Sequence, residues 1–465
     1  MSIPYARSNP LYNRNAPSPL ASVSVVIPTL TETMNLPESG SGKIVLDLAP
    51  AMESTVPPDW SGARWIGLVD LTVLAGVGSL RLKNADGYQR ARLLIRQGRS
   101  VRGFVDVETL GGVLDRNVLD EALDSLPTAE PSAPGSSARS ITVIVCTRDR
   151  ASMLRPALRA ILALDYPNFD VIVVDNAART DETRELVRSE FDDPRLRLVS
   201  EPVPGLSHAR NTGLRHAKGD IVAFTDDDVV VDRHWLSEIA EGFERSPRVA
   251  CVTGLVASGE ARSPTQAYFE NRVSWSKNVV PRVFSLAEPP EDLPTFPFCI
   301  GRFGTGANFA LDRRHAVALG EFDTALGAGT RTCGGEDVDM FTRVIFGGYS
   351  LVVQPSAIVW HRHRDGLEDL QAQARGYGIG LGAWILKIFL NPRTAWRALI
   401  KSPRAVRNLL KNSRPLPHGA GAPGGRIADQ WDVEMAKMGR LELFSVARGP
   451  FNYLVQCWSD RRRTP

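Results

Sequence analysis

The chain has 465 residues, of which 43% are hydrophobic and 23% charged, and its formal net charge is +3. These values exclude a largely disordered chain, and the length predicts two or three globular domains. A charge so close to balance gives no reason to expect a nucleic-acid partner.

The cysteines and the apolar segments predict a cytoplasmic protein. The five cysteines are scattered and lack the spacing of a metal site, which favours a reducing compartment. Residues 1–19 contain no apolar core of the signal-peptide type. The longest apolar stretch, residues 376–390, is shorter than a membrane span. We therefore expect a cytoplasmic protein, either dissolved or peripheral on the inner face of the membrane.

The first part of the chain predicts a small accessory domain. After a flexible N-terminus at residues 1–19, short strand-like apolar runs are followed by one helical segment. The runs are 22–27, 43–48, 65–71, 91–95 and 101–107, and the helical segment is 116–126. Residues 20–126 are therefore interpreted as a mostly β or an α+β domain. Residues 127–138 are rich in proline, serine and alanine without apolar periodicity, which is typical of a linker.

From residue 139 the pattern changes to strands that alternate with helices. Strands rich in valine and isoleucine are expected at 141–146, 171–175, 195–200 and 221–224. Helices are expected at 152–164, 181–190 and 207–217, from residue 235, and again after residue 336. This alternation predicts a mostly parallel sheet with helices on both faces, and it brings the carboxyl ends of the strands to one edge. Residues 139–375 are assigned to this α/β domain.

The remaining residues, 376–465, are predicted to be helical and basic. Between residues 392 and 414, seven lysine and arginine residues are interspersed with apolar ones. Such a segment can lie on an anionic membrane surface. It can also pack its apolar side on the preceding domain and leave its charges in water. Peripheral membrane contact through residues 376–414 is thus one of two open interpretations.

Three carboxylates in a row, Asp226, Asp227 and Asp228, come just after the expected strand at 221–224. Ligand sites are typical of the carboxyl edge of such a sheet. Asp226 and Asp228, two residues apart, suit Mg²⁺ or Mn²⁺, which commonly share their coordination shell with substrate phosphates. The alternative is an acidic turn that closes the strand.

Polar residues also follow the first two strands of this domain. Thr147 and Arg148 follow the first strand, and Asp175 and Asn176 follow the second. Carboxylate and backbone groups at these positions could hydrogen-bond a nucleobase, although any strand end can carry a polar cap.

Two further positions downstream carry groups that could act in catalysis. Glu336 and Asp337 are expected to open a helix, because glycines precede them and apolar residues follow at helical spacing. Acidic residues are favourable in a first helical turn for electrostatic reasons alone, but one here could also act as a general base. His361 follows an apolar run and could complete a metal shell or serve as an ordinary polar cap.

Together these segments resemble a family 2 glycosyltransferase of the GT-A fold, which has a Rossmann-like, mostly parallel sheet with flanking helices. The resemblance covers half the chain and is carried by Thr142–Thr147 with Arg148, Val171–Asn176, Ala209–Gly213 before Gly219–Asp220, Phe224–Asp228 and Gly335–Asp337. Residues Gly376–Gly382 also look like the segment that follows the catalytic domain in many bacterial members. Residues 20–126 resemble N-terminal extensions of some actinobacterial members. Within them, Val23–Glu32 looks like the opening strand of the family and is interpreted as a truncated repeat or a chance match.

The resemblance implies roles for individual residues. It implies nucleotide contacts for Thr147, Arg148, Asp175, Asn176, Arg210, Asp226 and Asp227, with Asp175 on the base. It implies a Mg²⁺ or Mn²⁺ ion held by Asp226, Asp228 and His361, with His363 as the rival ligand. It makes Asp337 the catalytic base with Glu336 in support, and it places Gly304, Thr305, Gly306 and Asn308 around the acceptor-side sugar pocket.

The implied activity is metal-dependent, inverting transfer of a sugar from a nucleotide-diphosphate donor, with a UDP-sugar expected before others. The acceptor would be a hydroxyl of a glycan, a lipid-linked sugar or a small natural product, in cell-wall or polysaccharide biosynthesis. Two alternatives stay open: a non-catalytic protein that binds nucleotides or glycans on the same fold, and a sugar nucleotidyltransferase. The latter is expected to hold a triphosphate with a glycine-rich loop after its first strand, and residues 146–150 contain no glycine.

Overall fold

The computed structural model describes residues 44–54, 56–58, 60–128, 139–273, 275–401 and 426–462, except for the side chains of residue 275 and residues 426–436. Several predicted segments lie outside the described residues: the N-terminus 1–19, the strand 22–27, the segment Val23–Glu32, most of the linker 127–138, and residues 402–414 of the basic segment. The predictions for these segments stay predictions.

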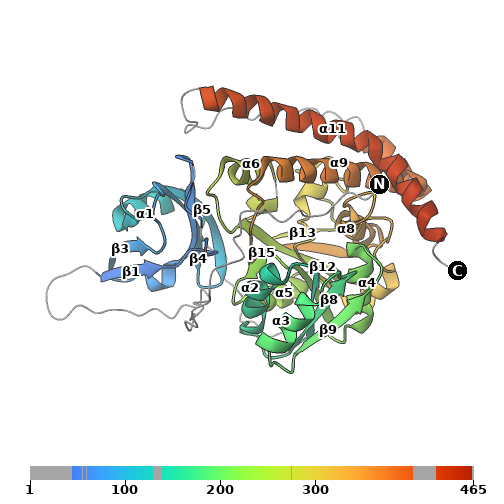
Figure 1. Cartoon of the computed structure of the whole chain (residues 1–465), viewed down its shortest axis with the longest axis horizontal. Coiled ribbons are helices and arrows are strands. Elements are labelled where there is room, and N and C mark those ends of the chain that lie inside the picture. Colours follow the sequence, from blue (N-terminus) through green and yellow to red (C-terminus); the bar gives the residue numbers. More distant parts are fainter. Residues whose placement is uncertain are drawn as a thin grey trace.

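The described N-terminal residues form two three-stranded sheets and a helix (Figure 1). One sheet has the order β1 (Ile44–Leu48), β3 (Val77–Leu82), β6 (Val113–Asp115), and the other has the order β2 (Arg64–Asp70), β4 (Arg90–Gln97), β5 (Ser100–Glu108). A 3-10 turn at Leu71–Val73 and helix α1 (Arg116–Leu123) complete this part. Strands β1, β2, β4 and β5 and helix α1 occur where the apolar pattern predicts them. Strands β3 and β6 were not predicted, because glycine, serine and charged residues interrupt their short apolar runs.

Within the described residues, the central sheet of the following part has nine strands in the order β11-β15-β12-β14-β10-β7-β8-β9, with β13 beside β15. Their bounds are β7 (Ile141–Thr147), β8 (Phe169–Asn176), β9 (Leu196–Glu201), β10 (Ile221–Asp226), β11 (Val229–Val231), β12 (Val249–Ser258), β13 (Arg282–Phe284), β14 (Asn308–Asp312) and β15 (Ser350–His361). Strands β10, β7, β8 and β9 are mutually parallel, and their register pairs Asp226 with Cys146 and Thr147 with Asp175. The acidic cluster and the two polar strand ends therefore lie at one edge of the sheet, as predicted.

Helices cover both faces of this sheet, because alternate strand residues point to opposite sides. On one face, Val143 and Val145 belong to a buried cluster with residues of α2 (Ala151–Leu162) and α5 (Trp235–Glu244). On the other face, Ile144 belongs to a cluster with residues of α4 (Leu206–His216) and α8 (Glu336–Phe346). The other helical elements here are α3 (Glu182–Glu190), α6 (Pro264–Arg272) and α7 (Arg313–Leu319), with 3-10 turns at Trp275–Lys277 and Ile300–Arg302. The prediction of an α/β domain with a mostly parallel sheet is confirmed.

The N-terminal part packs directly against the α/β part and shares a core with it. Ile66 and Leu94 of the N-terminal sheet cluster with Leu255, Ile358 and Trp360 of the central sheet. Ion pairs extend this contact, with Arg96 Nη1 3.0 Å from Asp232 Oδ2 and Arg99 Nε 2.6 Å from Glu238 Oε1. The N-terminal part is thus attached by apolar and charged contacts as well as by the chain itself.

Two long helices, α9 (Leu367–Leu390) and α11 (Arg426–Arg461), lie together along one side of the molecule, with α11 outermost (Figure 1). Helix α9 begins at Leu367, so the predicted boundary between residues 375 and 376 falls inside a helix. Residues 392–401 are helical as well. No helix within the described residues combines the length and the hydropathy that crossing a bilayer requires.

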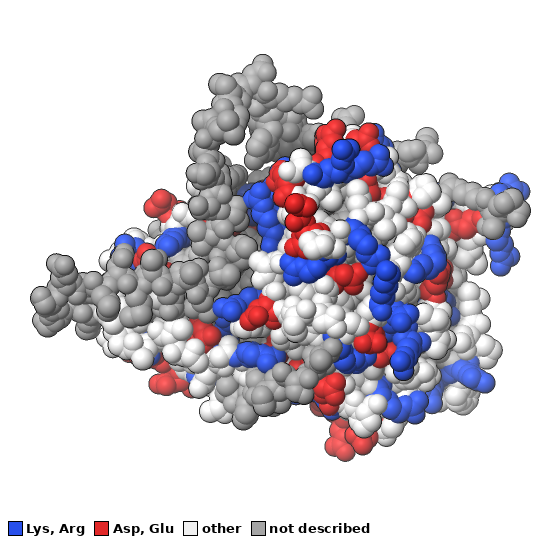
Figure 2. Space-filling model, turned by 90° about the horizontal axis from the view of Figure 1, so that it is seen from below, with Lys and Arg blue, Asp and Glu red and all other residues white. Residues whose placement is uncertain are grey.

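The face of the molecule opposite α11 carries charges of both signs. Figure 2 shows lysine and arginine side chains interspersed with aspartate and glutamate over this face. This mixture agrees with the small net charge of +3.

Candidate active site

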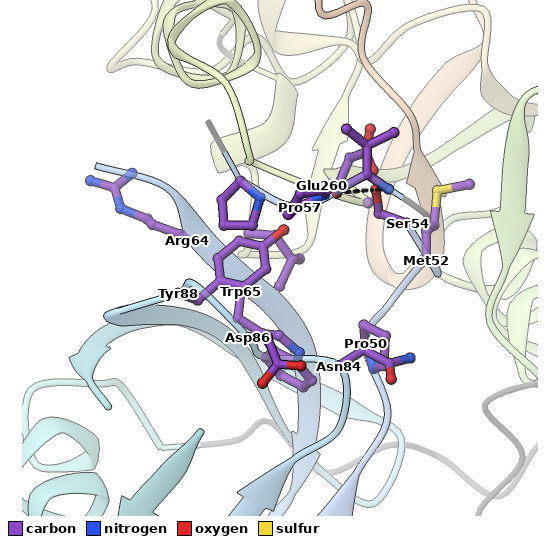
Figure 3. A pocket seen from close by; sticks show the side chains of 14 residues that line it. Pro50, Met52, Ser54, Pro57, Arg64, Trp65, Asn84, Asp86, Tyr88 and Glu260 are labelled. Carbon is purple, nitrogen blue, oxygen red and sulfur yellow. Dashed lines mark hydrogen bonds between the residues drawn. The ribbon is translucent and has the colours of Figure 1, made fainter. Parts of the chain in front are cut away.

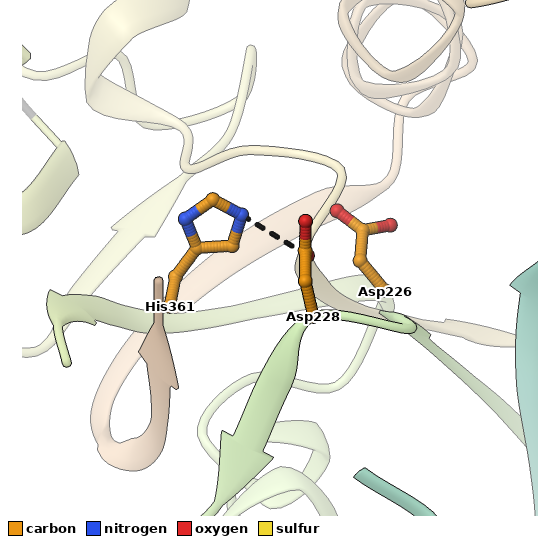
Figure 4. Close-up of side chains that lie close together, drawn as sticks. All are labelled: Asp226, Asp228 and His361. Carbon is orange, nitrogen blue, oxygen red and sulfur yellow. Dashed lines mark ion pairs between the residues drawn. The ribbon is translucent and has the colours of Figure 1, made fainter. Parts of the chain in front are cut away.

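The acidic cluster comes together with His361 at the carboxyl edge of the sheet. Strand β10 ends at Asp226, a turn follows, and β11 then pairs with β15 so that Val229 lies opposite His361. This register brings His361 Nε2 within 3.2 Å of Asp228 Oδ1 (Figure 4). One ligand atom each of Asp226, Asp228 and His361 lies within 4.8 Å of the other two.

The charges of this cluster depend on one another. Burial raises the pKa of Asp226 to about 6. Burial also raises the pKa of Asp228, but the neighbouring His361 and Arg150 outweigh this effect, so that the pKa of Asp228 lies below its usual range. The pKa of His361 is lowered by burial but raised more by Asp228, so that its net shift is upward. Half-buried carboxylates beside an imidazole are therefore held at a site where a divalent cation would compensate their charge.

The donor set of this cluster fits a divalent metal ion. Two carboxylates and one imidazole are ligands that Mn²⁺ accepts readily, and Mg²⁺ accepts the carboxylates. His363 is the less suitable ligand, because it is buried and its Nδ1 lies 3.0 Å from His361 Nδ1. One of these two ring nitrogens must donate and the other accept, which holds the His361 ring with Nε2 towards Asp228.

Arg150 contacts Asp227 and Asp228, and the sequence analysis did not identify it as a site residue. Its guanidinium donates from Nη1 to Asp227 Oδ1 at 2.5 Å and from Nη2 to Asp228 Oδ2 at 2.8 Å. Thr147 Oγ1 donates to Asp227 Oδ2 at 2.7 Å. Asp227 is buried and bonded to these two residues, so it supports the turn and does not belong to the cluster of ligand atoms.

Arg210 joins the acidic cluster to the start of helix α8. The buried guanidinium donates from Nη1 to Glu336 Oε1 at 2.9 Å and from Nη2 to the Gly306 carbonyl at 3.0 Å. Its Nη2 also lies 3.8 Å from Asp226 Oδ1. Phe309 and Phe322 pack against the guanidinium, with ring centroids at 5.3 and 5.7 Å. Arg210 was predicted to contact the nucleotide, but it is only 3% exposed and lies between Asp226 and Glu336.

Asp337 and Glu336 open helix α8 and differ in environment. The Gly306 backbone amide donates to Asp337 Oδ2 at 2.7 Å, and the Val338 amide donates to Asp337 Oδ1 at 2.8 Å. Glu336 is buried, and both burial and the adjacent Asp337 raise its pKa to about 7. Half-buried Asp337 is therefore the more accessible of the two carboxylates, whereas the buried Glu336 accepts from Arg210 with its Oε1.

The polar strand ends differ in how many of their groups are already bonded. Asp175 is buried, its pKa is raised by burial and by Asp149, and its Oδ1 has no hydrogen-bond partner among the described residues. Asn176 is fully used by the chain, since it donates to the Glu201 and Val203 carbonyls and accepts from the Gly205 amide. Arg148 is half-buried. At this edge, Asp175 thus offers an acceptor atom for a ligand, and Asn176 does not.

Asn308 was predicted to shape the sugar pocket, and the structure places it in the core instead. Its amide donates to the Leu255 and Ala357 carbonyls, and its Oδ1 accepts from Trp235 Nε1. Asn308 is fully buried because it begins strand β14 in the middle of the sheet. The loop before it contains Gly304, Thr305 and Gly306, and the Gly306 amide contacts Asp337. This loop therefore lies beside the site, as predicted, although Asn308 does not.

Tyr377 of helix α9 also lies near the site, outside the segment assigned to the α/β domain. Gln373 donates to its hydroxyl at 3.1 Å, and its ring centroid lies 6.3 Å from that of Phe269. Tyr377 is 43% exposed, and its pKa is raised by partial desolvation and, more weakly, by the nearby charges of Asp337 and Asp226. Its position in the glycine run Gly376–Gly382 was the only signal in the sequence that pointed to it.

The glycines of α9 bring this helix against two different neighbours. A Cβ on Gly378 or Gly382 would come within 2.4 or 2.0 Å of a carbonyl oxygen of α11. On the opposite side of the helix, two residues from each of them, a Cβ on Gly380 would lie 2.8 Å from the backbone of Gly334, just before Glu336 and Asp337. The glycines thus let α9 support the loop that presents the proposed base.

Replacing Gly380 by alanine is expected to lower the transfer rate by about tenfold to a hundredfold, because the loop before Asp337 must move away. Gly376→Ala is the matched control, since its Cβ would meet the Cys333 Cβ at an ordinary 3.4 Å. Both changes favour the helix itself by up to about 1 kcal/mol. The turnover number and the melting temperature of both variants should be measured, and equal activity of the two would contradict this role for Gly380.

A separate pocket of about 250 Å³ lies between the N-terminal part and the α/β part (Figure 3). Tyr88 and Trp65 line it from one side and Glu260 from the other. Arg362 follows His361 and points to this side of the strand end, where its Nε lies 3.8 Å from Glu260 Oε1 and its Nη2 donates to the Glu53 carbonyl. The residues that line the pocket include none of Asp226, Asp228 and His361, so the pocket is distinct from the acidic cluster.

Residues 142–314 match the family Glycosyl transferase family 2. The chain contains a family 2 glycosyltransferase domain. This confirms the resemblance, and the mostly parallel sheet with its flanking helices is the GT-A architecture that the resemblance implies. Glu336, Asp337 and His361 lie beyond the matched residues, so their roles stay proposals.

The chain is also similar to named glycosyltransferases. It is 30% identical over 292 residues to the Pre-mycofactocin glycosyltransferase of Mycobacterium tuberculosis, which covers 62% of this chain and 55% of that relative. It is 31% identical over 228 residues to the Succinoglycan biosynthesis protein ExoM of Rhizobium meliloti, which covers 47% of this chain and 65% of that relative. The chain thus spans about half the length of the mycobacterial protein.

Among solved structures, the chain is similar to the mannosyltransferase PcManGT of Pyrobaculum calidifontis in complex with GDP-Man and Mn²⁺. The identity is 21%, the TM-score is 0.45, and the match covers 68% of this chain and 89% of the other.

Proposed function

We propose that the protein transfers a sugar from a nucleotide-diphosphate donor to an acceptor hydroxyl, in a metal-dependent reaction that inverts the anomeric configuration. The observation that carries this proposal is that carboxylates suited to hold a metal ion and a carboxylate suited to act as a base lie together at one edge of the sheet. Asp226 and Asp228 lie with His361 as a set of metal ligands, and Asp337 is connected to them through Arg210 and the Gly306 backbone. A metal site alone would suit many proteins, whereas a partly exposed base beside it suits group transfer.

The donor would be held by the acidic cluster and the ends of β7 and β8. Asp226, Asp228 and His361 would hold Mg²⁺ or Mn²⁺, and such an ion stabilises the negative charge of a diphosphate leaving group when it is bound. Asp175 Oδ1, a buried acceptor without a partner among the described residues, would accept from an N–H of the base. The N3–H of uracil or thymine, or the N1–H of guanine, could donate to it, so a UDP-sugar is the first of three donor classes to test.

The acceptor hydroxyl would be activated by Asp337. Its Oδ2 accepts from the Gly306 amide, and this bond fixes the carboxylate. The lone pairs that remain on its oxygens can take the proton of a hydroxyl. Attack of that hydroxyl on the anomeric carbon, from the face opposite the diphosphate, inverts the configuration in one displacement. No covalent intermediate with the enzyme is needed. The acceptor would be a glycan, a lipid-linked sugar or a small molecule.

Thermal stabilisation by UDP, dTDP and GDP, each with and without Mn²⁺, tests this proposal. We expect one nucleotide to raise the melting temperature, and to do so only with the metal. Binding to the folded state alone stabilises it by about 2.7 kcal/mol at a hundredfold excess over the dissociation constant.

The other outcomes distinguish the remaining interpretations. Absence of a shift with every nucleotide would contradict the proposed donor site. A metal-dependent shift without transfer from the corresponding sugar nucleotides to any acceptor class would favour the non-catalytic binding protein. A stronger shift with a nucleoside triphosphate would favour the nucleotidyltransferase.

A further inference from the structure

The outer face of helix α11 exposes a row of bulky apolar side chains. Phe444 is 75% exposed and Phe451 70%, and Leu454 and Trp458 are each more than half exposed. Their spacing of seven, three and four residues places all of them on one side of the helix. Large apolar side chains that stand together on a surface mark an interaction site more often than isolated ones do.

Basic residues lie on the same side of the helix. Arg440, Arg448 and Arg462 are exposed and follow the apolar side chains at helical spacing. The Arg462 guanidinium lies over the Trp458 ring, 3.6 Å from its centroid. Basic and aromatic side chains therefore form one continuous stripe.

The acidic residues of α11 with described side chains lie on the opposite side. Glu442 pairs with Arg272 of α6, and Asp460 accepts from Gln456 at 2.9 Å. The stripe thus carries basic charges without acidic ones among the side chains of residues 437–462. This differs from the face of mixed charge in Figure 2.

The rotation of α11 is fixed by its inner side, so that the stripe must face outward. Met438, Ser445 and Tyr453 are buried, and the Tyr453 hydroxyl donates to Asp323 Oδ2 at 2.8 Å. Gly449 packs so closely on α9 that a Cβ there would lie 2.3 Å from the Ile379 carbonyl. In Figure 1, α11 forms the outermost layer on this side.

The end of α9 and the residues after it also expose apolar side chains. Leu386 of α9 clusters with Tyr453 and Cys457 of α11, so the two C-terminal ends lie side by side. Beyond this contact, Leu390, Trp396 and Ile400 are each more than half exposed, and Arg393 and Arg397 lie among them.

We propose that the outer face of α11, together with residues 390–400, docks on the surface of an anionic lipid bilayer. Aromatic and aliphatic side chains of this kind enter the boundary between headgroups and acyl chains, and arginines bind anionic headgroups. A helix that lies flat on the membrane needs no spanning segment. Of the two interpretations given for residues 376–414, the described residues thus favour a membrane contact, and this contact includes α11.

This contact would place the proposed active site next to the membrane. The same helix α9 that carries α11 on one side supports the loop before Asp337 on the other and contributes Tyr377. A lipid-linked acceptor could then reach Asp337 from the bilayer. Only this last step rests on the proposed function, because the lipid contact does not depend on catalysis.

Co-sedimentation with vesicles tests the proposal on the full chain without substrates. We expect binding to vesicles of phosphatidylcholine with about one third phosphatidylglycerol, and much weaker binding to phosphatidylcholine alone. The triple variant Phe444→Ser, Phe451→Ser, Trp458→Ser should lose at least about tenfold in affinity for the anionic vesicles. The double variant Arg448→Glu, Arg462→Glu should lose the preference for anionic vesicles.

A matched control replaces exposed apolar residues elsewhere. Leu110→Ser with Val317→Ser removes two highly exposed side chains from other surfaces and should leave vesicle binding unchanged. The melting temperature and the metal-dependent nucleotide shift of every variant show whether it is folded, so that failure of the lipid contact is distinguishable from failure of the proposed function. Absence of vesicle binding by the natural chain overturns the proposal. A dimer that the triple variant converts to a monomer, without vesicle binding in either, identifies a second copy as the occupant and also overturns it.

Discussion

Replacing Asp337 by asparagine is expected to reduce sugar transfer by about a hundredfold to ten-thousandfold while nucleotide affinity changes little. The amide has the volume of the carboxylate, and its oxygen can still accept from the Gly306 backbone, so the loop is expected to keep its position although the bond from the Val338 amide is lost. What is lost is the ability to take a proton from the acceptor hydroxyl. The turnover number should be measured with the donor that the thermal shifts identify, and the dissociation constant of the nucleotide should be measured with Mn²⁺ present.

Asp115→Asn is a matched control for this change. Asp115 also stands at the start of a helix, where it accepts from the Asn117 amide, but it belongs to the N-terminal part. Its replacement should change neither turnover nor nucleotide affinity. If Asp337→Asn lowered nucleotide affinity as much as turnover, Asp337 would support the structure of the donor site and the base would have to be sought elsewhere.

Local patterns in the sequence predicted strands β7 to β10, helices α2 to α5 and α8, and the position of the acidic cluster, but not strands β11 to β14 or helices α6 and α7. Strands such as β7 and β8 are buried on both faces, so they appear in the sequence as continuous runs of valine and isoleucine, a pattern typical of buried parallel strands. Parallel strands separated by helices bring their carboxyl ends to one edge, which is why Asp175 and Asp226 could be placed together before any contact was known.

Contacts between distant segments could not be predicted in the same way. Arg150 binds two carboxylates almost eighty residues away, and its position in the chain gives no sign of this. Asn308 follows a glycine-rich loop, and only the strand pairing of β14 shows that its amide is used within the core. Whether a polar residue bonds to the chain or remains available for a ligand depends on neighbours that a single sequence does not identify.

Replacing Asp228 by asparagine is expected to weaken metal-dependent nucleotide binding by at least about a hundredfold. Asp228 faces His361 with one oxygen and Arg150 with the other, so the change removes a negative charge that both side chains contact. The stabilisation that Mn²⁺ adds to the nucleotide should disappear at the concentrations that saturate the natural chain. Titration of Mn²⁺ by the melting temperature at a fixed nucleotide concentration measures this effect.

Asp227→Asn separates the loss of a metal ligand from the loss of a negative charge in the turn. Asp227 is adjacent and bonded to the same Arg150, yet it lies outside the set of ligand atoms. This variant should keep the dependence on Mn²⁺ even where it lowers stability.

The two histidines can be compared in the same way: His361→Ala should weaken the metal-dependent rise in melting temperature more than His363→Ala. The reverse order would make His363 the ligand, and equal loss in the two aspartate variants would mean that the turn as a whole, and not Asp228, holds the metal.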